Sequence, residues 1–119
     1  MSTPVGPYTP IVRAGEWLVV SGQVGIADGK LVAGGLEAEL RQAVANLEGL
    51  LASEGASLRD VAKTTVFLKH LATDYPRMNE VYIELFGDHR PARSAIGVAE
   101  LPIGALVELE AWAHMGPSR

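Results

Sequence analysis

Arg93, Glu108 and Glu110 are the residues whose types and spacing best suit chemistry. Arg93 opens a short run at residues 93–98, and the two glutamates alternate with apolar residues in a second run at residues 106–113. Both runs are typical of β-strands, and a turn containing proline and glycine separates them. A planar guanidinium and a carboxylate on neighbouring strands can hold a small organic acid and exchange protons with it. We interpret these two strands as the candidate site and the remaining chain as its scaffold.

Two amphipathic helices are predicted upstream of these strands. Apolar residues at i, i+4, i+7 and i+8 predict one helix over residues 36–54, with Asn46 as a polar residue on its flank. A second helix is predicted from about residue 75 to residue 86, after a loop at residues 70–74 in which Thr73 or Asp74 provides the cap. Further strands are predicted at residues 11–12, 17–20, 30–33 and 61–68.

This order of elements predicts an α+β fold, in which two helices cover one face of a mixed β-sheet of four to six strands. In the last strand, alternate residues from Val107 to Ala113 point to the helices. The opposite face carries Leu106, Glu108, Glu110 and Trp112. That face is too apolar for an ordinary wet surface and too charged for a dry core. A subunit interface that contains a polar site satisfies both properties, so we expect a homo-oligomer.

Composition limits the function classes. The chain has 119 residues, of which 48% are hydrophobic and 20% charged, which is typical of one globular domain spanning residues 1–119. Its net charge of -4 argues against nucleic acid as the main partner, because nucleic-acid binding needs a basic surface. The absence of cysteine excludes disulfides, thiolate metal ligands and cysteine nucleophiles.

The sequence predicts neither a membrane segment nor a metal site. No apolar run approaches the length of a membrane span, and the first ten residues lack the pattern of a signal peptide. The three histidines do not have the spacing of metal ligands. A cytoplasmic protein is therefore the expectation.

The C-terminal third also carries a family resemblance. The segments Pro91-Ala92-Arg93-Ser94, Leu101-Pro102 and Val107-Glu108-Leu109-Glu110-Ala111 resemble the signature of the YjgF/RidA imine deaminases. Upstream, Gly6-Pro7-Tyr8 and Ser21-Gly22-Gln23 are similar to further family segments, so the resemblance spans nearly the whole chain. It implies a chorismate-mutase-like fold that assembles as a trimer with clefts between subunits.

The resemblance also implies an activity and a site. The activity is hydrolysis of short 2-imino acids, such as 2-iminopropanoate and 2-iminobutanoate, and of their enamine tautomers, to 2-oxo acids and ammonia. The catalytic residues that it implies are Arg93 and Glu108. The substrate-binding residues that it implies are Tyr8, Ser21, Gly22, Arg93 and Ala95. The chain departs from many members at Ala95, where they have cysteine, so a role for that thiol is absent here.

Several alternatives remain open from the residues themselves. Tyr8 can simply pack the N-terminal arm onto the body, and the Ser21 hydroxyl can bond to local backbone. Arg93 and Glu108 can form a structural ion pair across strands. Spacing does not choose between Glu108 and Glu110 as the acid–base group, and only the resemblance favours Glu108. A non-catalytic binder of 2-oxo acids that regulates a partner is the main alternative function, and a ribonuclease is a distant third because of the acidic charge.

Overall fold

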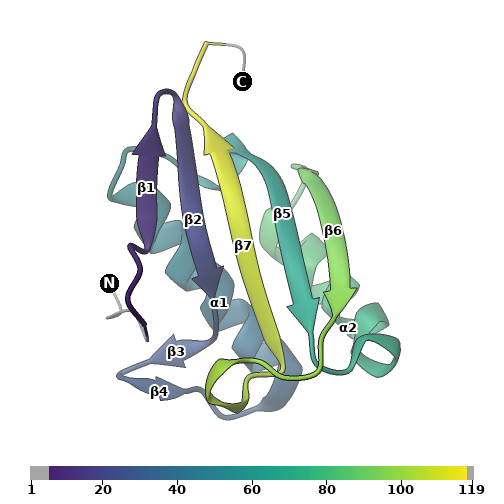
Figure 1. Cartoon of the computed structure of the whole chain (residues 1–119). Helices are drawn as coiled ribbons and strands as arrows, with labels where there is room; N and C mark the ends of the chain where they lie inside the picture. Colours follow the sequence, from purple (N-terminus) through teal and green to yellow (C-terminus); the bar gives the residue numbers. More distant parts are fainter. Residues whose placement is uncertain (1–5, 118–119) are drawn as a thin grey trace.

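A computed structural model describes residues 6–117 of the chain. Strands precede, separate and follow its two helices, and the helices lie behind the sheet in the view of Figure 1. The strands are β1 (Ile11–Ala14), β2 (Trp17–Gln23), β3 (Ile26–Ala27), β4 (Lys30–Leu31), β5 (Val61–Leu68), β6 (Ala92–Gly97) and β7 (Val107–His114). The helices are α1 (Gly35–Ala52) and α2 (Leu71–Phe86), with 3-10 turns η1 (Leu58–Asp60) and η2 (Pro102–Gly104).

The main sheet has five strands in the order β1-β2-β7-β5-β6 (Figure 1). Strands β5 and β6 pair in parallel because α2 carries the chain back between them, whereas the other neighbours are antiparallel. The sheet is therefore mixed, as predicted. The two C-terminal strands are not neighbours: β5 lies between β6 and β7, which corrects the expectation that Arg93 and Glu108 stand on adjacent strands.

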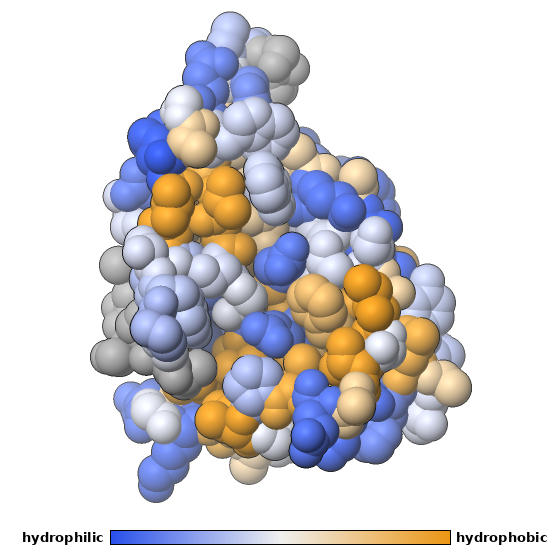
Figure 2. All heavy atoms as spheres, in the orientation of Figure 1, coloured by the Kyte–Doolittle hydropathy of each residue, from blue (hydrophilic) through white to orange (hydrophobic). Residues whose placement is uncertain are grey.

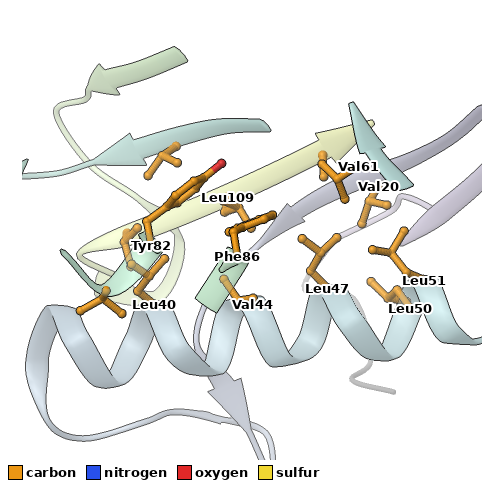
Figure 3. Close-up of a cluster of buried hydrophobic side chains, with 14 of the residues drawn as sticks. Val20, Leu40, Val44, Leu47, Leu50, Leu51, Val61, Tyr82, Phe86 and Leu109 are labelled. Atoms are coloured by element: carbon orange, nitrogen blue, oxygen red, sulfur yellow. The ribbon is translucent and has the colours of Figure 1, made fainter. Parts of the chain in front are cut away.

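Both helices pack on one face of the sheet and form the core with it. Leu40, Val44 and Leu47 of α1 are fully buried, and Figure 3 shows them lying below Leu109 of β7. Tyr82 and Phe86 of α2 enter the same cluster, with their rings stacked at 4.4 Å between centroids. Burial of each such large apolar side chain stabilises the fold by about 1.5–3 kcal/mol. Packing against α1 and α2 therefore fixes the position of the strands.

The predicted helices and strands are largely confirmed, but β2 continues to Gln23 rather than ending at Val20, the short strand β3 is not among the predicted strands, and the start of α2 differs. Strand β5 has the predicted bounds, and α1 lies within about two residues of its predicted ends. The second helix begins at Leu71 rather than near residue 75, and its cap residue is His70 rather than Thr73 or Asp74. Pro76 therefore lies in the second turn of the helix, where it has no N–H to donate to the carbonyl four residues earlier.

No helix of residues 6–117 covers the opposite face of the main sheet, which we call the open face. Strand β7 alternates as predicted: Val107, Leu109, Ala111 and Ala113 are buried, while the residues between them are partly or largely exposed. Figure 2 shows this face as a mixture of hydrophobic and hydrophilic patches. Trp17 and Trp112, at 38% and 44% exposed, lie edge to face on it with 6.0 Å between ring centroids. Within residues 6–117, no helix is long and apolar enough to cross a membrane.

Candidate functional site

Glu108 lies on the open face, between two buried residues of β7. Its neighbours Val107 and Leu109 are fully buried against the helices, so the alternation of the strand directs the Glu108 side chain away from them. Gly22 of β2 lies against this carboxylate. A Cβ at Gly22 would come within 2.7 Å of the carboxyl carbon of Glu108, and only glycine leaves that space open.

The surroundings of Glu108 favour its protonated form. Burial raises the pKa of the Glu108 carboxyl above its ordinary value, and the negative charge of Glu110 on the same face raises this pKa further. Among the described residues, no arginine, lysine or histidine forms an ion pair with Glu108 to oppose these effects. A carboxyl group whose pKa is raised in this way is a candidate for general acid–base catalysis.

Ser21 connects this region to the N-terminal arm. Its hydroxyl donates to the carbonyl oxygen of Thr9 at 2.7 Å, and its backbone N–H donates to the carbonyl oxygen of Pro10 at 2.8 Å. The hydroxyl is thus used for local backbone bonding, one of the two alternatives stated above, although its oxygen can still accept a hydrogen bond. These bonds hold Tyr8, which precedes Thr9 and is 43% exposed, beside the same end of β2.

Arg93 occupies a different environment, on edge strand β6 and facing α2. It pairs in register with Thr64, which is fully buried. One terminal nitrogen donates to the Tyr75 hydroxyl at 3.1 Å, and the guanidinium carbon lies 4.9 Å from the centre of the Tyr82 ring. The other terminal nitrogen lies 3.7 Å from the Met78 sulfur.

No carboxylate of the described chain pairs with Arg93. By contrast, Arg41 and Arg77 both bind Glu37, and Arg41 also meets Glu84 at 2.6 Å, in an exposed network that joins the two helices. Arg93 instead borders a cavity of about 440 Å³, and its positive charge is available to an anion there. The cavity is lined by Leu71, Ala72, Tyr75, Pro76, Arg93 and Ala95.

The candidate residues therefore form two groups rather than one. The acidic half-site contains Glu108, Gly22 and Ser21 on the open face, and the arginine half-site contains Arg93, Ala95 and Tyr75 beside α2. Strand β5 separates the two strands involved, and the register aligns Arg93 with Ala111, three residues from Glu108. Arg93 and Glu108 are therefore separated by about 10 Å across the sheet and by about 10 Å along it, and they lie on opposite faces of the sheet. The predicted alternative of an ion pair between them is wrong for the same reason.

Comparison with known proteins gives a consistent family. A family model described as endoribonuclease L-PSP matches residues 1–115. A RutC family protein of Pyrococcus horikoshii is 42% identical over 113 residues, which cover 93% of this chain and 89% of the relative. A 2-iminobutanoate/2-iminopropanoate deaminase of Mus musculus is 42% identical over 115 residues, which cover 95% of this chain and 84% of the relative.

The fold agrees with these sequence matches. The crystal structure of RidA from an Antarctic Psychrobacter species superimposes with a TM-score of 0.90 at 34% identity, covering 94% of this chain and 91% of that chain. The chain belongs to the YjgF/RidA family. The resemblance stated from the sequence is thereby confirmed, and so is the α+β fold of two helices on a mixed sheet.

Ala95, one of the predicted substrate-binding residues, lies in the arginine half-site. It pairs with Val66 of β5, faces the helices and borders the cavity beside Arg93. As an alanine, Ala95 offers only its methyl group and its backbone to a ligand. Among the described residues, no three histidine, aspartate or glutamate side chains are grouped so that they could hold a metal ion.

Tyr75 and Tyr82 are the residues that sequence reasoning did not connect with Arg93. The apolar spacing of the second helix predicts that both lie on its buried face. Tyr82 is buried, but Tyr75 is 39% exposed and its hydroxyl accepts a hydrogen bond from Arg93. The useful signal was their spacing of seven residues, which places both on one stripe of a helix together with Met78. Asn79, on the same helix, has a buried side-chain oxygen with no hydrogen-bond partner in the described residues.

Proposed function

We propose that the protein hydrolyses short-chain 2-imino acids and their enamine tautomers to 2-oxo acids and ammonia. The observation that carries this proposal is Glu108: a half-buried carboxyl group with a raised pKa, beside a glycine, on a face with no helix over it. Support also comes from the Mus musculus relative, which is named for this reaction at 42% identity.

Arg93 supplies the binding half of the proposal. A 2-imino acid carries one carboxylate next to the reacting carbon, and the guanidinium fork matches a carboxylate in charge and geometry. Arg93 suits this role because no side-chain carboxylate of the described residues neutralises it and because it borders a cavity. The apolar walls of that cavity accommodate a short aliphatic chain beside the carboxylate.

The two half-sites of one chain cannot contact one small ligand together, so the proposal includes an oligomer. In a homotrimer, with the number taken from the family resemblance, the arginine half-site of one subunit meets the acidic half-site of its neighbour. Trp17 and Trp112 are exposed on the open face of the single chain, and their burial against a partner subunit would stabilise the oligomer. Light scattering should therefore give about three times the chain mass of 12.6 kDa at micromolar concentration, and a monodisperse monomer would contradict this assembly.

The reaction needs two proton movements at one carboxyl group. Ionised Glu108 takes a proton from water as the water oxygen attacks the carbon of the protonated imine, which gives a neutral carbinolamine. The protonated Glu108 then gives that proton to the amino nitrogen, the carbon–nitrogen bond breaks, and ammonia leaves with the hydroxyl proton, as ammonium, while the carbonyl forms. Water is consumed and no cofactor is required, because the imine carbon is already electrophilic.

The deciding experiment measures imine loss directly. 2-Iminopropanoate or 2-iminobutanoate is generated in situ from an amino acid by an auxiliary enzyme, and its disappearance is followed with and without the protein. Faster loss with the parent protein than with buffer supports the deaminase. Binding of a 2-oxo acid without accelerated loss would favour the non-catalytic metabolite binder instead. The net charge of -4 makes a ribonuclease the weaker reading of the family description, and an RNA cleavage assay provides its test.

A further inference from the structure

Tyr75 has a hydroxyl group with one hydrogen-bonding function still available. Its oxygen accepts a hydrogen bond from a terminal nitrogen of Arg93 at 3.1 Å. Arg93 has only donors, so the proton of the phenol remains free to be donated elsewhere. Tyr75 is 39% exposed and lines the same cavity as Arg93, which places this donor where a ligand of Arg93 would lie.

Tyr82 holds the guanidinium of Arg93 from the other side. The guanidinium carbon lies 4.9 Å from the Tyr82 ring centre, which is within the range of a cation–π interaction. The Tyr82 ring is itself fixed, because its hydroxyl shares a hydrogen bond of 2.7 Å with buried Thr64 and its ring stacks on Phe86. Burial raises the pKa of the Tyr82 hydroxyl, so the residue stays neutral and interacts with Arg93 through its ring.

We propose that Tyr75 and Arg93 together form the receptor for the carboxylate of the ligand, and that Tyr82 is the positioning residue that fixes Arg93 within it. One carboxylate oxygen accepts from the guanidinium and the other accepts from the Tyr75 hydroxyl. The hydrogen bond between the two residues keeps their donors side by side. This inference rests on the proposed function, because it concerns the 2-imino and 2-oxo acids that the site would bind.

The walls of the cavity strengthen this assignment. Apart from Tyr75 and Arg93, the residues that line it are Leu71, Ala72, Pro76 and Ala95, none of which has a side-chain hydrogen-bond donor. A carboxylate in this cavity therefore has two side chains of the described chain from which it can accept hydrogen bonds. Hydrogen bonds to charged groups are stronger than those between neutral groups, and the loss of one should change the affinity by about tenfold to a hundredfold.

Calorimetric titration of the assembled full-length protein with pyruvate tests the receptor. Tyr75→Phe keeps the ring and removes the hydroxyl, so it should weaken pyruvate binding about tenfold or more. In the imine assay it should raise KM with little change in kcat, because the lost contact is made equally to substrate and transition state. Ile83→Ala is the matched control, since Ile83 lies on the same helix, is 51% exposed and is not among the residues that line the cavity.

A second probe separates carboxylate recognition from a general loss of structure. Methyl pyruvate has the same carbon skeleton but carries no charge, so Tyr75→Phe should change its affinity little. In a double-mutant cycle with Arg93→Lys, the cost of Tyr75→Phe for pyruvate should shrink, because the two residues act on one group. Equal losses for pyruvate and methyl pyruvate, or strictly additive losses in the cycle, would contradict the receptor.

NMR of the Arg93 side chain tests the positioning role of Tyr82 without any ligand. The Nε–Hε signal of Arg93 should carry a ring-current shift to which the Tyr82 ring at 4.9 Å contributes more than the Tyr75 ring at 5.7 Å. Tyr82→Leu should therefore reduce this shift, and Ile83→Ala should leave it in place. If Tyr82→Leu leaves the signal unchanged, Tyr82 does not position Arg93.

The outcomes distinguish this inference from the proposed function. If the parent protein hydrolyses the imine but Tyr75→Phe binds pyruvate as tightly as the parent, the receptor is wrong and the deaminase stands. If the parent binds pyruvate in a Tyr75-dependent way but does not accelerate imine loss, the deaminase is wrong and the receptor belongs to a metabolite binder. If millimolar pyruvate does not bind to the parent protein, the receptor is wrong whatever the hydrolysis assay gives.

Discussion

Leu109 and Glu108 are consecutive residues of β7, yet they lie in two different environments. Leu109 is fully buried on the helix-covered face, where the contacts of one chain complete its packing. Glu108 is only half-buried on the open face, where the carboxyl group has a raised pKa and no ion-pair partner among the described residues. The covered face thus accounts for the stability of the fold. On the open face, the Glu108 carboxyl group has no ion-pair partner among the described residues and is not needed for packing of the core, which is typical of a functional residue.

A substitution at Glu108 should give the largest functional effect of this comparison. Glu108→Gln keeps the size of the side chain but removes proton exchange, so turnover should fall by roughly 10²–10⁴-fold. Pyruvate affinity and the melting temperature should stay close to those of the parent protein, because the covered face is untouched. The assay compares imine hydrolysis by the two proteins. Hydrolysis at the parent rate would show that Glu108 is not the acid–base group and would make Glu110 the next candidate.

The neighbouring position should show the reverse pattern. Leu109→Ala leaves a cavity under α1 and should lower the free energy of unfolding by about 2–5 kcal/mol. Denaturant titration measures this loss, and Ile83→Ala, at an exposed position of α2, should stay within about 0.5 kcal/mol of the parent protein. Equal stabilities for Leu109→Ala and the parent would mean that β7 is not anchored through its covered face.

The elements of the fold could be predicted because their signals are local. The apolar stripe of α1 and the alternation of β7 each follow from the spacing of residues within one element, and the structure confirms both. The sequence predicts a later start for α2 because proline is most often found in the first turn of a helix, whereas Pro76 lies in the second turn here. Asn46, predicted as a flank residue, instead donates to the carbonyl oxygens of Val24 and Ile26, which a helix pattern cannot reveal.

The arrangement of the candidate site could not be predicted because its determinants are not local. Strand β6 has no clearly apolar face, so nothing in its sequence indicates on which side of the sheet Arg93 lies. The insertion of β5 between β6 and β7 depends on the crossover through α2, which joins segments far apart in the chain. The residue types of the site were therefore accessible from the sequence, but their division between two faces was not.

Gly22 offers a milder way to disturb the open face. Gly22→Ala introduces a Cβ within 2.7 Å of the carboxyl carbon of Glu108, so the flexible carboxylate must move aside while the backbone can stay in place. Displacing a reacting group by about an ångström can lower the rate by up to about a hundredfold. We therefore expect Gly22→Ala to slow imine hydrolysis, but by less than Glu108→Gln does. Circular dichroism should show a parent-like fold. A parent-like rate would mean that the position of the Glu108 carboxylate is not critical.

The smallest effect is expected from Glu110, the second cause of the raised pKa of Glu108. Glu110→Gln removes a negative charge that disfavours ionisation, so the pKa of Glu108 should fall, although burial should keep it above the ordinary value of 4.5. If ionised Glu108 is the base, the acidic limb of the rate profile should move to lower pH, with little change in rate above that limb. When folding raises the pKa of a carboxyl group, the folded protein loses stability as the pH rises from the pKa of that group in the unfolded state through its pKa in the folded state. Glu110→Gln should lower the folded-state pKa of Glu108. The pH range over which stability is lost should therefore become narrower, and the total loss of stability should become smaller.

Two measurements on Glu110→Gln should then agree in direction. The pH profile of kcat/KM reports the essential groups of the free enzyme, and denaturant titration across the same pH range reports the stability linked to Glu108. Ile83→Ala, which carries no charge and lies away from the open face, should leave both profiles in place. If the acidic limb stays where it is while the stability profile shifts, Glu108 titrates as expected but does not set the rate. If neither profile shifts, the charge of Glu110 does not act on Glu108, and burial alone raises its pKa.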